Sequence, residues 1–179
     1  FDELVRLGKE AGLKTIFKLV FYGVRPRGDR GWDMVWNNRD GTRDRILEGW
    51  TLIWKRYQAE PSVFGYDLIN EPARGLSRDY ERIQREQLLP LLRRLTDAMH
   101  GISPGKWALY QPLLRKPEDQ KTPHRDPVVP VDEPFGRERV IYAPHLYQMN
   151  THVIPMMLDN LQRQAALSRA PLLLGEWGS

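Results

Sequence analysis

Apolar residues along the chain follow two spacings, one typical of helices and one typical of buried strands. Residues 1–11 and 42–57 repeat their apolar positions every three or four residues, as expected for helices that cover a core. Residues 78–100 and 152–168 predict two further helices, with Pro90 as a kink in the first. Continuous apolar runs predict buried strands over residues 13–22, 63–70, 107–111, 140–145 and 171–176. Helices and strands therefore alternate.

Each predicted strand is apolar along its whole length rather than at every second residue. Strands buried on both faces are typical of a parallel sheet covered by helices. Doubly wound sheets and (β/α)8 barrels both fit, but the sequence lacks the glycine-rich turn of a doubly wound nucleotide fold. Because a whole barrel has eight strands in about 250 residues, we predict an α/β fold that is an incomplete (β/α)8 TIM barrel with about five parallel strands.

Two long segments lack a helical or strand period and are predicted as loops. Residues 24–41 are rich in Arg, Gly, Asn and Trp, and residues 112–138 hold six of the 14 prolines. No repeat or low-complexity linker divides the chain, so we expect residues 1–179 to form a single partial barrel domain. Since the chain opens within a helical pattern and stops just after a strand, we expect it to be a piece of a longer protein.

Composition and charge exclude several classes of protein. The net charge of +4 comes mostly from arginines beside acidic residues, so we expect no binding to nucleic acid. The absence of cysteine excludes a disulfide scaffold and a thiolate metal site. No run reaches the roughly 18 apolar residues of a membrane span. No His/Asp cluster has ligand spacing, so we predict no metal and no cofactor. Localisation stays open, with secretion as one option.

Polar residues gather where the predicted strands end, and parallel α/β folds build their active sites at these ends. The strand-end residues are Asn70, Glu71, Gln111, His145, Tyr147, Glu176 and Trp177. Two carboxylates on one rim suit cleavage of a glycosidic bond, since one donates a proton to the leaving oxygen and the other attacks the anomeric carbon. A separation of about 5 Å would give retention of configuration. The alternative is that the glutamates only form ion pairs.

Three segments resemble the motifs of one enzyme family. GYDLINEP (65–72) and LLLGEWGS (172–179) resemble the acid/base and nucleophile motifs of glycoside hydrolase family 5, the cellulase-type retaining β-glycosidases with a (β/α)8 barrel. VIYAPHLYQ (140–148) resembles the family's His-x-Tyr strand end. The resemblance spans the family's third to seventh strands.

The resemblance implies a role for each residue that matches a motif. Glu71 would be the acid/base and Glu176 the nucleophile. Asn70 would donate to the sugar 2-hydroxyl, Tyr147 would hydrogen-bond Glu176, and His145 would line the site beside the acid/base.

Some family features are missing or altered. The usual arginine of the second strand and tryptophan of the eighth strand belong to strands that this chain lacks. Many members place a His at the end of the third strand, where this sequence reads Lys18-Leu19-Val20-Phe21-Tyr22. Tyr22 would either replace that group as a hydroxyl donor or pack in the core.

Three tryptophans are candidates for sugar contacts. Trp32 and Trp36 in the 24–41 loop would stack on sugar rings or plug the side of the barrel. Trp177 would line the site or pack behind it. Asp67, in the middle of a strand, is expected to be a buried polar residue without a catalytic role.

The resemblance implies an O-glycosyl hydrolase that cleaves β-linked oligosaccharides, polysaccharides or glycoconjugates with retention, as in polysaccharide degradation. Two alternatives stay open. GYDLINEP also resembles endoglycoceramidase-like glycolipid glycosidases, and a non-catalytic carbohydrate-binding barrel fragment would use its glutamates only as ion pairs. We expect the 179-residue chain alone to have little activity, because missing strands leave open sheet edges.

Overall fold

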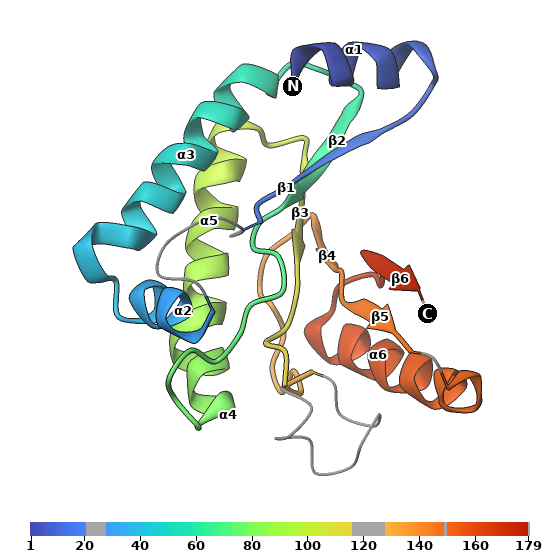
Figure 1. Cartoon of the computed structure of the whole chain (residues 1–179). Coiled ribbons are helices and arrows are strands. Elements are labelled where there is room, and N and C mark those ends of the chain that lie inside the picture. Colours follow the sequence, from blue (N-terminus) through green and yellow to red (C-terminus); the bar gives the residue numbers. More distant parts are fainter. Residues whose placement is uncertain (21–27, 116–127, 149, 179) are drawn as a thin grey trace.

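The computed structural model describes residues 1–20, 28–115, 128–148 and 150–178 (Figure 1). The helices are α1 (Asp2–Glu10), α2 (Asp29–Trp36), α3 (Thr42–Tyr57), α4 (Tyr80–Ile83), α5 (Leu89–Ile102) and α6 (Ile154–Ser168). A π-helical turn, Gln84–Leu88, joins α4 to α5, and 3-10 turns precede α3 and α6. The strands are β1 (Thr15–Lys18), β2 (Val63–Asp67), β3 (Trp107–Tyr110), β4 (Val140–Tyr142), β5 (His145–Tyr147) and β6 (Glu176–Gly178).

All strands of the described chain pair in parallel. β1, β2, β3 and β4 form one sheet in chain order, and β5 pairs with β6. Residues 171–175 continue the alignment, because the amide of Leu173 donates to Tyr142 and the amide of Gly175 donates to Pro144. With β4 and β5 taken as one interrupted strand, five parallel chain segments lie side by side, which is the α/β barrel fragment predicted from the sequence.

The predicted strand 140–145 is divided in two, and the reason is local. Pro144 has no amide hydrogen and cannot donate within a central strand. Strand β4 therefore ends at Tyr142, although the amide of Ala143 still donates to Tyr110, and β5 begins at His145, where it pairs with β6. The interruption lies directly before the polar residues of the strand end.

Two helical segments differ from the sequence prediction. The region predicted as a loop over 24–41 contains α2, whose Trp32, Val35 and Trp36 have helical spacing among Gly and Arg residues. The expected kink at Pro90 takes the form of the π-helical turn that precedes α5. Proline clashes with the carbonyl four residues earlier and lacks an amide hydrogen, and a wider turn accommodates both effects. Residues 112–115 and 128–138 form no helix.

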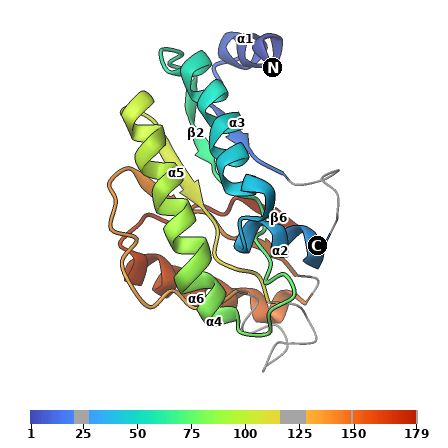
Figure 2. The same ribbon diagram turned by 90° about the vertical axis from the view of Figure 1, so that its left-hand side faces the viewer.

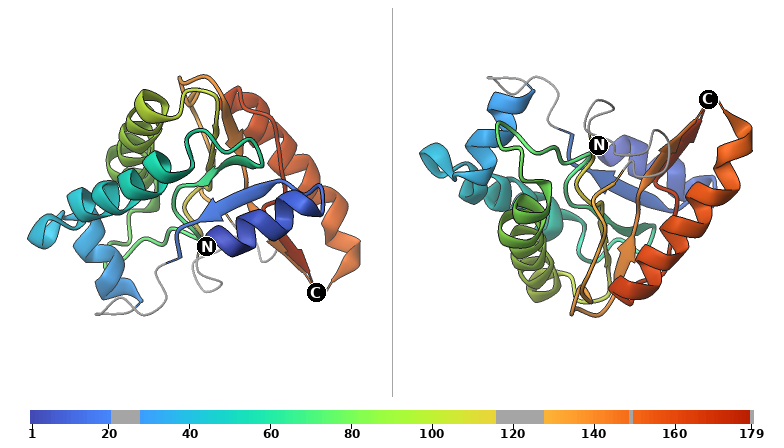
Figure 3. Two further views of the ribbon diagram at one scale, coloured as in Figure 1. Left: turned by 90° about the horizontal axis from the view of Figure 1, so that it is seen from above. Right: turned by 90° about the horizontal axis from the view of Figure 1, so that it is seen from below.

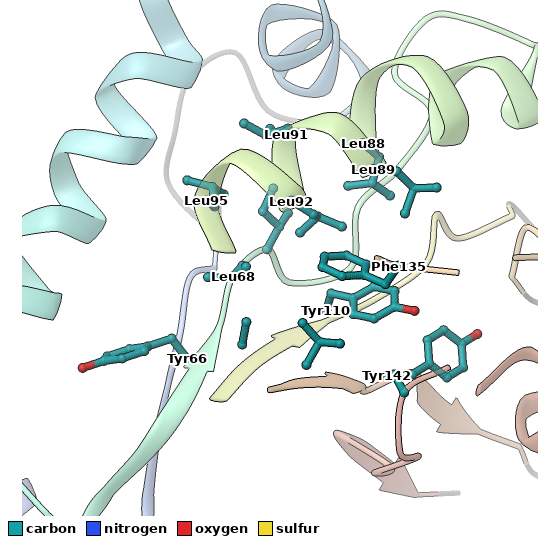
Figure 4. Packing of buried hydrophobic residues seen from close by; sticks show 14 of the residues in the cluster. Tyr66, Leu68, Leu88, Leu89, Leu91, Leu92, Leu95, Tyr110, Phe135 and Tyr142 are labelled. Carbon is teal, nitrogen blue, oxygen red and sulfur yellow. The ribbon is translucent and has the colours of Figure 1, made fainter. Parts of the chain in front are cut away.

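Helices cover the outer side of the strands. Seen along the sheet in Figure 3, α1, α3, α5 and α6 lie in an arc outside the strands, and Figure 2 shows α3 and α5 side by side. The main core lies between these layers, where leucines of α5 pack towards Tyr110 and Phe135, whose rings stack at 4.4 Å (Figure 4). None of the described helices is both long and apolar enough to cross a membrane.

The opposite face of the sheet is the inner face of the barrel fragment. Leu109 and Ile141 form a small apolar cluster there, separate from the main core, because side chains alternate across a strand. Asp67 is the register partner of Leu109 and Lys18 is the register partner of Asp67. Two charged residues therefore lie in this inner row, next to the strand ends.

Candidate active site

The strand ends bring Glu71, His145 and Glu176 together. Glu71 follows β2, and His145 and Glu176 are register partners on β5 and β6. His145 Nδ1 lies 2.9 Å from Glu71 Oε1, and His145 Nε2 lies 3.6 Å from Glu176 Oε1. The three side chains have one polar atom each within 4.8 Å of the others. Two glutamates 105 positions apart in the sequence thus share one site.

Glu71 has an unusual backbone conformation. Its φ is 44°, in the left-handed region that a side chain other than glycine's rarely adopts. The amide of Glu71 donates to Gln111 Oε1 over 3.0 Å, and Gln111 Nε2 donates to Asp67 Oδ2 over 2.8 Å. A residue at the end of β3 and a buried residue of β2 therefore hold the backbone of Glu71.

Glu176 is surrounded by donors. The Lys18 ammonium lies 2.5 Å from its Oε1, and the Tyr147 hydroxyl donates to its Oε2 over 2.9 Å. The Lys18 ammonium, then the Tyr147 hydroxyl and His145, hold the pKa of Glu176 below its usual range, against the opposing effect of partial burial. This carboxyl group is thus held in its ionised form.

Lys18 is a site residue that the sequence reading missed. The apolar run over residues 13–22 predicts a buried strand and gives Lys18 no role. A charged residue inside an apolar strand was the signal that could have found it. Lys18 Nζ also lies 3.1 Å from His145 Nε2 and 3.6 Å from Asp67 Oδ2.

Two buried polar residues of β2 and its end adjoin the glutamates. Burial raises the pKa of Asp67 to about 6, although Gln111, Lys18 and His145 lower it. Asn70 is buried, and its Oδ1 has no hydrogen-bond partner within the described residues. A buried amide oxygen without a partner is uncommon, and this one belongs to the residue directly before Glu71.

The tryptophans occupy three different environments. Trp36 is 4% exposed and its indole donates to Ala73 O over 2.8 Å, so the structure places it in the core, with no open ring face for a sugar. Trp32 is half-buried and stacks on Trp36 at 5.3 Å. Trp177 is 75% exposed on β6. Tyr22 lies outside the described residues.

Glu71, His145 and Glu176 together offer three potential ligand atoms for a metal ion. The Lys18 ammonium already provides a cation at 2.5 Å from one of them and 3.1 Å from another. The three residues therefore form a carboxylate paired with a lysine and a second carboxylate paired with a histidine. The absence of a metal or cofactor stays a prediction.

Comparison with known proteins agrees with the three motifs. Endoglycoceramidase I of Rhodococcus hoagii (strain 103S) is 28% identical over 135 residues, which are 70% of this chain and 26% of that protein. Endo-glycoceramidase II from Rhodococcus sp. superposes with a TM-score of 0.76 at 18% identity, over 97% of this chain and 51% of that one.

The structure of an endoglucanase resembles this chain about as closely as the endo-glycoceramidase structure does. The catalytic domain of the major endoglucanase from Xanthomonas campestris pv. campestris gives a TM-score of 0.72 at 17% identity, over 99% of this chain and 55% of that one. The chain thus spans about a quarter of the curated relative and about half of each solved structure. The sequence model of Cellulase (glycosyl hydrolase family 5) matches residues 1–179, so the chain belongs to this family.

Proposed function

We propose that this chain carries the catalytic glutamates of a retaining β-glycoside hydrolase. The observation that carries the proposal is the approach of Glu71 and Glu176, whose nearest carboxylate oxygens lie within 4.8 Å. Retaining glycosidases keep their carboxyl groups about 5–5.5 Å apart, whereas inverting enzymes keep them about 6.5–9.5 Å apart to admit a water molecule. The short separation therefore favours a covalent intermediate.

The two glutamates have different surroundings, which support different roles. Glu176 pairs with Lys18 and is the nucleophile: its oxygen bonds to the anomeric carbon as the glycosidic C–O bond breaks. Glu71 faces His145, and gives its proton to the departing oxygen. Glu71 then takes a proton from water, which attacks the anomeric carbon and releases Glu176.

The neighbouring polar groups would contact the sugar bound between the glutamates. The amide of Asn70, which is buried directly before Glu71 and whose Oδ1 has no partner within the described residues, would hydrogen-bond the 2-hydroxyl. The exposed ring of Trp177 supplies an apolar surface for a sugar face. Trp32 is half-buried and is a second candidate for stacking.

The substrate is a β-linked glycan or glycoconjugate, and two classes are supported. One is a β-glucan, as the similarity to an endoglucanase suggests. The other is a glycolipid, favoured by endoglycoceramidase relatives in both sequence and structure, one of them solved as a complex with ganglioside GM3. A panel containing carboxymethylcellulose, cello-oligosaccharides and lactosylceramide separates the two classes.

The experiment compares Glu71→Ala and Glu176→Ala in the full-length protein, with the exposed Glu48→Ala as control. Glu71→Ala should lower kcat/KM by about 10²–10⁴-fold for substrates with poor leaving groups and far less for activated aryl glycosides, because only the former need a proton in the first step. Azide should rescue this variant and give a β-glycosyl azide. Glu176→Ala should lose activity on both substrate types. With azide, this variant should give the α-glycosyl azide.

Other outcomes contradict the proposal. Azide products of opposite configuration would mean that the two roles are exchanged. If both variants keep wild-type activity, the catalytic site lies elsewhere. If no β-glycoside is hydrolysed by the wild type, the binding-only alternative is correct.

A further inference from the structure

Lys18 lies at the centre of the polar groups at the strand ends. Its ammonium is 2.5 Å from Glu176 Oε1, 3.1 Å from His145 Nε2 and 3.6 Å from Asp67 Oδ2. The side chain is 23% exposed, so these contacts replace most of its hydration. One cation from β1 therefore reaches groups on β2, β5 and β6.

The contact with His145 determines where the imidazole proton lies. An ammonium group has three donors and no acceptor, so in this contact of 3.1 Å the Nε2 of a neutral His145 accepts from Lys18, while Glu176 Oε1 lies farther from Nε2, at 3.6 Å. The ring hydrogen of the neutral imidazole is then on Nδ1, which faces Glu71 Oε1 at 2.9 Å. His145 thus donates to Glu71.

The donation from His145 in turn distinguishes the two oxygens of Glu71. Oε1 accepts the imidazole N–H and cannot carry a hydrogen directed at the same donor. When Glu71 is protonated, its hydrogen is therefore on Oε2. A general acid works only when its proton faces the leaving oxygen, so the tautomer of His145 affects the first chemical step.

The same lysine balances the negative charge of the site. Glu71, Glu176 and Asp67 are three carboxyl groups near one imidazole, and Lys18 pairs with the last two. Asp67 is 1% exposed and is also held by Gln111, so it anchors the lysine from the inner face of the barrel. Lys18 therefore has a fixed partner on one side and Glu176 on the other.

We propose that Lys18 is a positioning residue of this site: it keeps Glu176 ionised and in place, and it fixes His145 as the Nδ1–H tautomer that directs the proton of Glu71 to Oε2. This inference rests on the proposed function for the roles of the two glutamates. Lys18 contacts Glu176 directly and contacts His145, which in turn contacts Glu71. Lys18 therefore acts on the nucleophile directly and on the acid/base through His145.

The first test is spectroscopic and needs no activity. Long-range 1H–15N correlation spectra of the 15N-labelled full-length protein report the tautomer of His145, with His145→Gln used to assign the signal. We expect Nδ1–H in the wild type and a shift towards Nε2–H in Lys18→Met, because Nε2 loses its donor. An Nε2–H tautomer in the wild type would overturn the proposal.

The second test is kinetic, with Lys18→Met, Lys18→Arg and the exposed Lys55→Met as control. Glu176 is faced by Lys18 from β1 and by His145 and Tyr147 from β5. Loss of the lysine removes the cation, so in Lys18→Met the acidic limb of kcat/KM should move up by about 1–3 pH units. The maximal kcat/KM should fall by about 10–100-fold. Lys18→Arg keeps the charge and should leave the limb near its wild-type position.

The two tests separate the possible failures. A large loss of activity in Lys18→Met with an unmoved acidic limb and an unchanged tautomer would mean that Lys18 is only a structural contact. If Lys18→Met does not fold, the tautomer of His145 in the wild type still decides, because Nε2–H there overturns the proposal. If the wild type hydrolyses no β-glycoside, the proposed function fails while the spectra still report on Lys18.

Discussion

Gln111 holds the backbone of Glu71: its side-chain oxygen accepts the Glu71 amide over 3.0 Å, while its amide group donates to Asp67 over 2.8 Å. Gln111 itself is 1% exposed, so a buried side chain makes both contacts. A glutamine directly after β3 thus holds the backbone of the glutamate that follows the neighbouring strand β2.

Replacing Gln111 with Met should disturb Glu71 without touching its side chain. The variant leaves a buried amide hydrogen and a buried carboxylate oxygen without this partner, which costs about 1–3 kcal/mol of unfolding free energy for each such group. We expect a lower kcat for poor leaving groups and a lower urea midpoint. Gln162→Met on the exposed face of α6 is the control. Unchanged kinetics would mean that Gln111 does not position Glu71.

Tyr147→Phe should change the pH dependence of the reaction. The Tyr147 hydroxyl is the second donor, after Lys18, that lowers the pKa of Glu176. Its loss raises this pKa, so the acidic limb of kcat/KM should move to higher pH, by less than about one unit because the contact is exposed. A pH profile with an activated aryl glycoside measures the shift. An acidic limb at the same pH as in the wild type would show that the Tyr147 hydroxyl does not lower the pKa of Glu176.

Asp67→Asn should stabilise the protein in a pH-dependent way. The pKa of Asp67 is about 6 in the folded chain and 3.8 in the unfolded reference, so protonation favours folding. The stability that this group contributes is full below about pH 3.8 and is lost as the pH rises through about 6. The stabilisation of Asp67→Asn relative to wild type should thus grow by up to about 3 kcal/mol from about pH 4 to about pH 8.

Urea unfolding at the two pH values measures this difference. Asp132→Asn, at an exposed position, should show no such growth. A constant difference for Asp67→Asn would mean that Lys18 and Gln111 compensate the burial of the carboxylate completely.

Gly175→Ala should displace His145. A methyl group at position 175 would lie 2.9 Å from the carbonyl oxygen of Ala143 and 3.2 Å from the imidazole Cδ2, both too close for carbon. We expect lower stability and lower kcat. Gly49→Ala on α3 meets open space and should instead stabilise the protein by about 0.5–1 kcal/mol. If Gly175→Ala keeps wild-type kcat, the imidazole tolerates the shift.

The motif residues at strand ends could be placed from the sequence because apolar runs locate parallel strands and their carboxyl ends share one rim. His145 and Glu176 meet as expected for this reason. Lys18 could not be placed in the same way, because its contacts depend on how far β1 lies from β6 around the barrel. Such distances come from packing, which the local pattern of residues does not specify.

The remaining differences concern local backbone geometry. The interruption at Pro144 and the π-helical turn before Pro90 come from missing amide hydrogens, which the sequence shows only as isolated prolines. Trp36 was a candidate for sugar contacts, but its helical spacing with Trp32 directs it into the core. Aromatic residues in an apparent loop therefore say little about whether their rings face the substrate.

The left-handed backbone of Glu71 has a consequence for how this protein would respond to selection. A non-glycine residue held in this region costs on the order of 1–3 kcal/mol, and glycine at the same place avoids most of that cost. A library screened for thermal stability alone should thus enrich Gly at position 71 and yield stable variants without catalytic activity. Directed evolution of this chain requires turnover as a second criterion, because ranking by heat resistance alone would discard the proposed acid/base first.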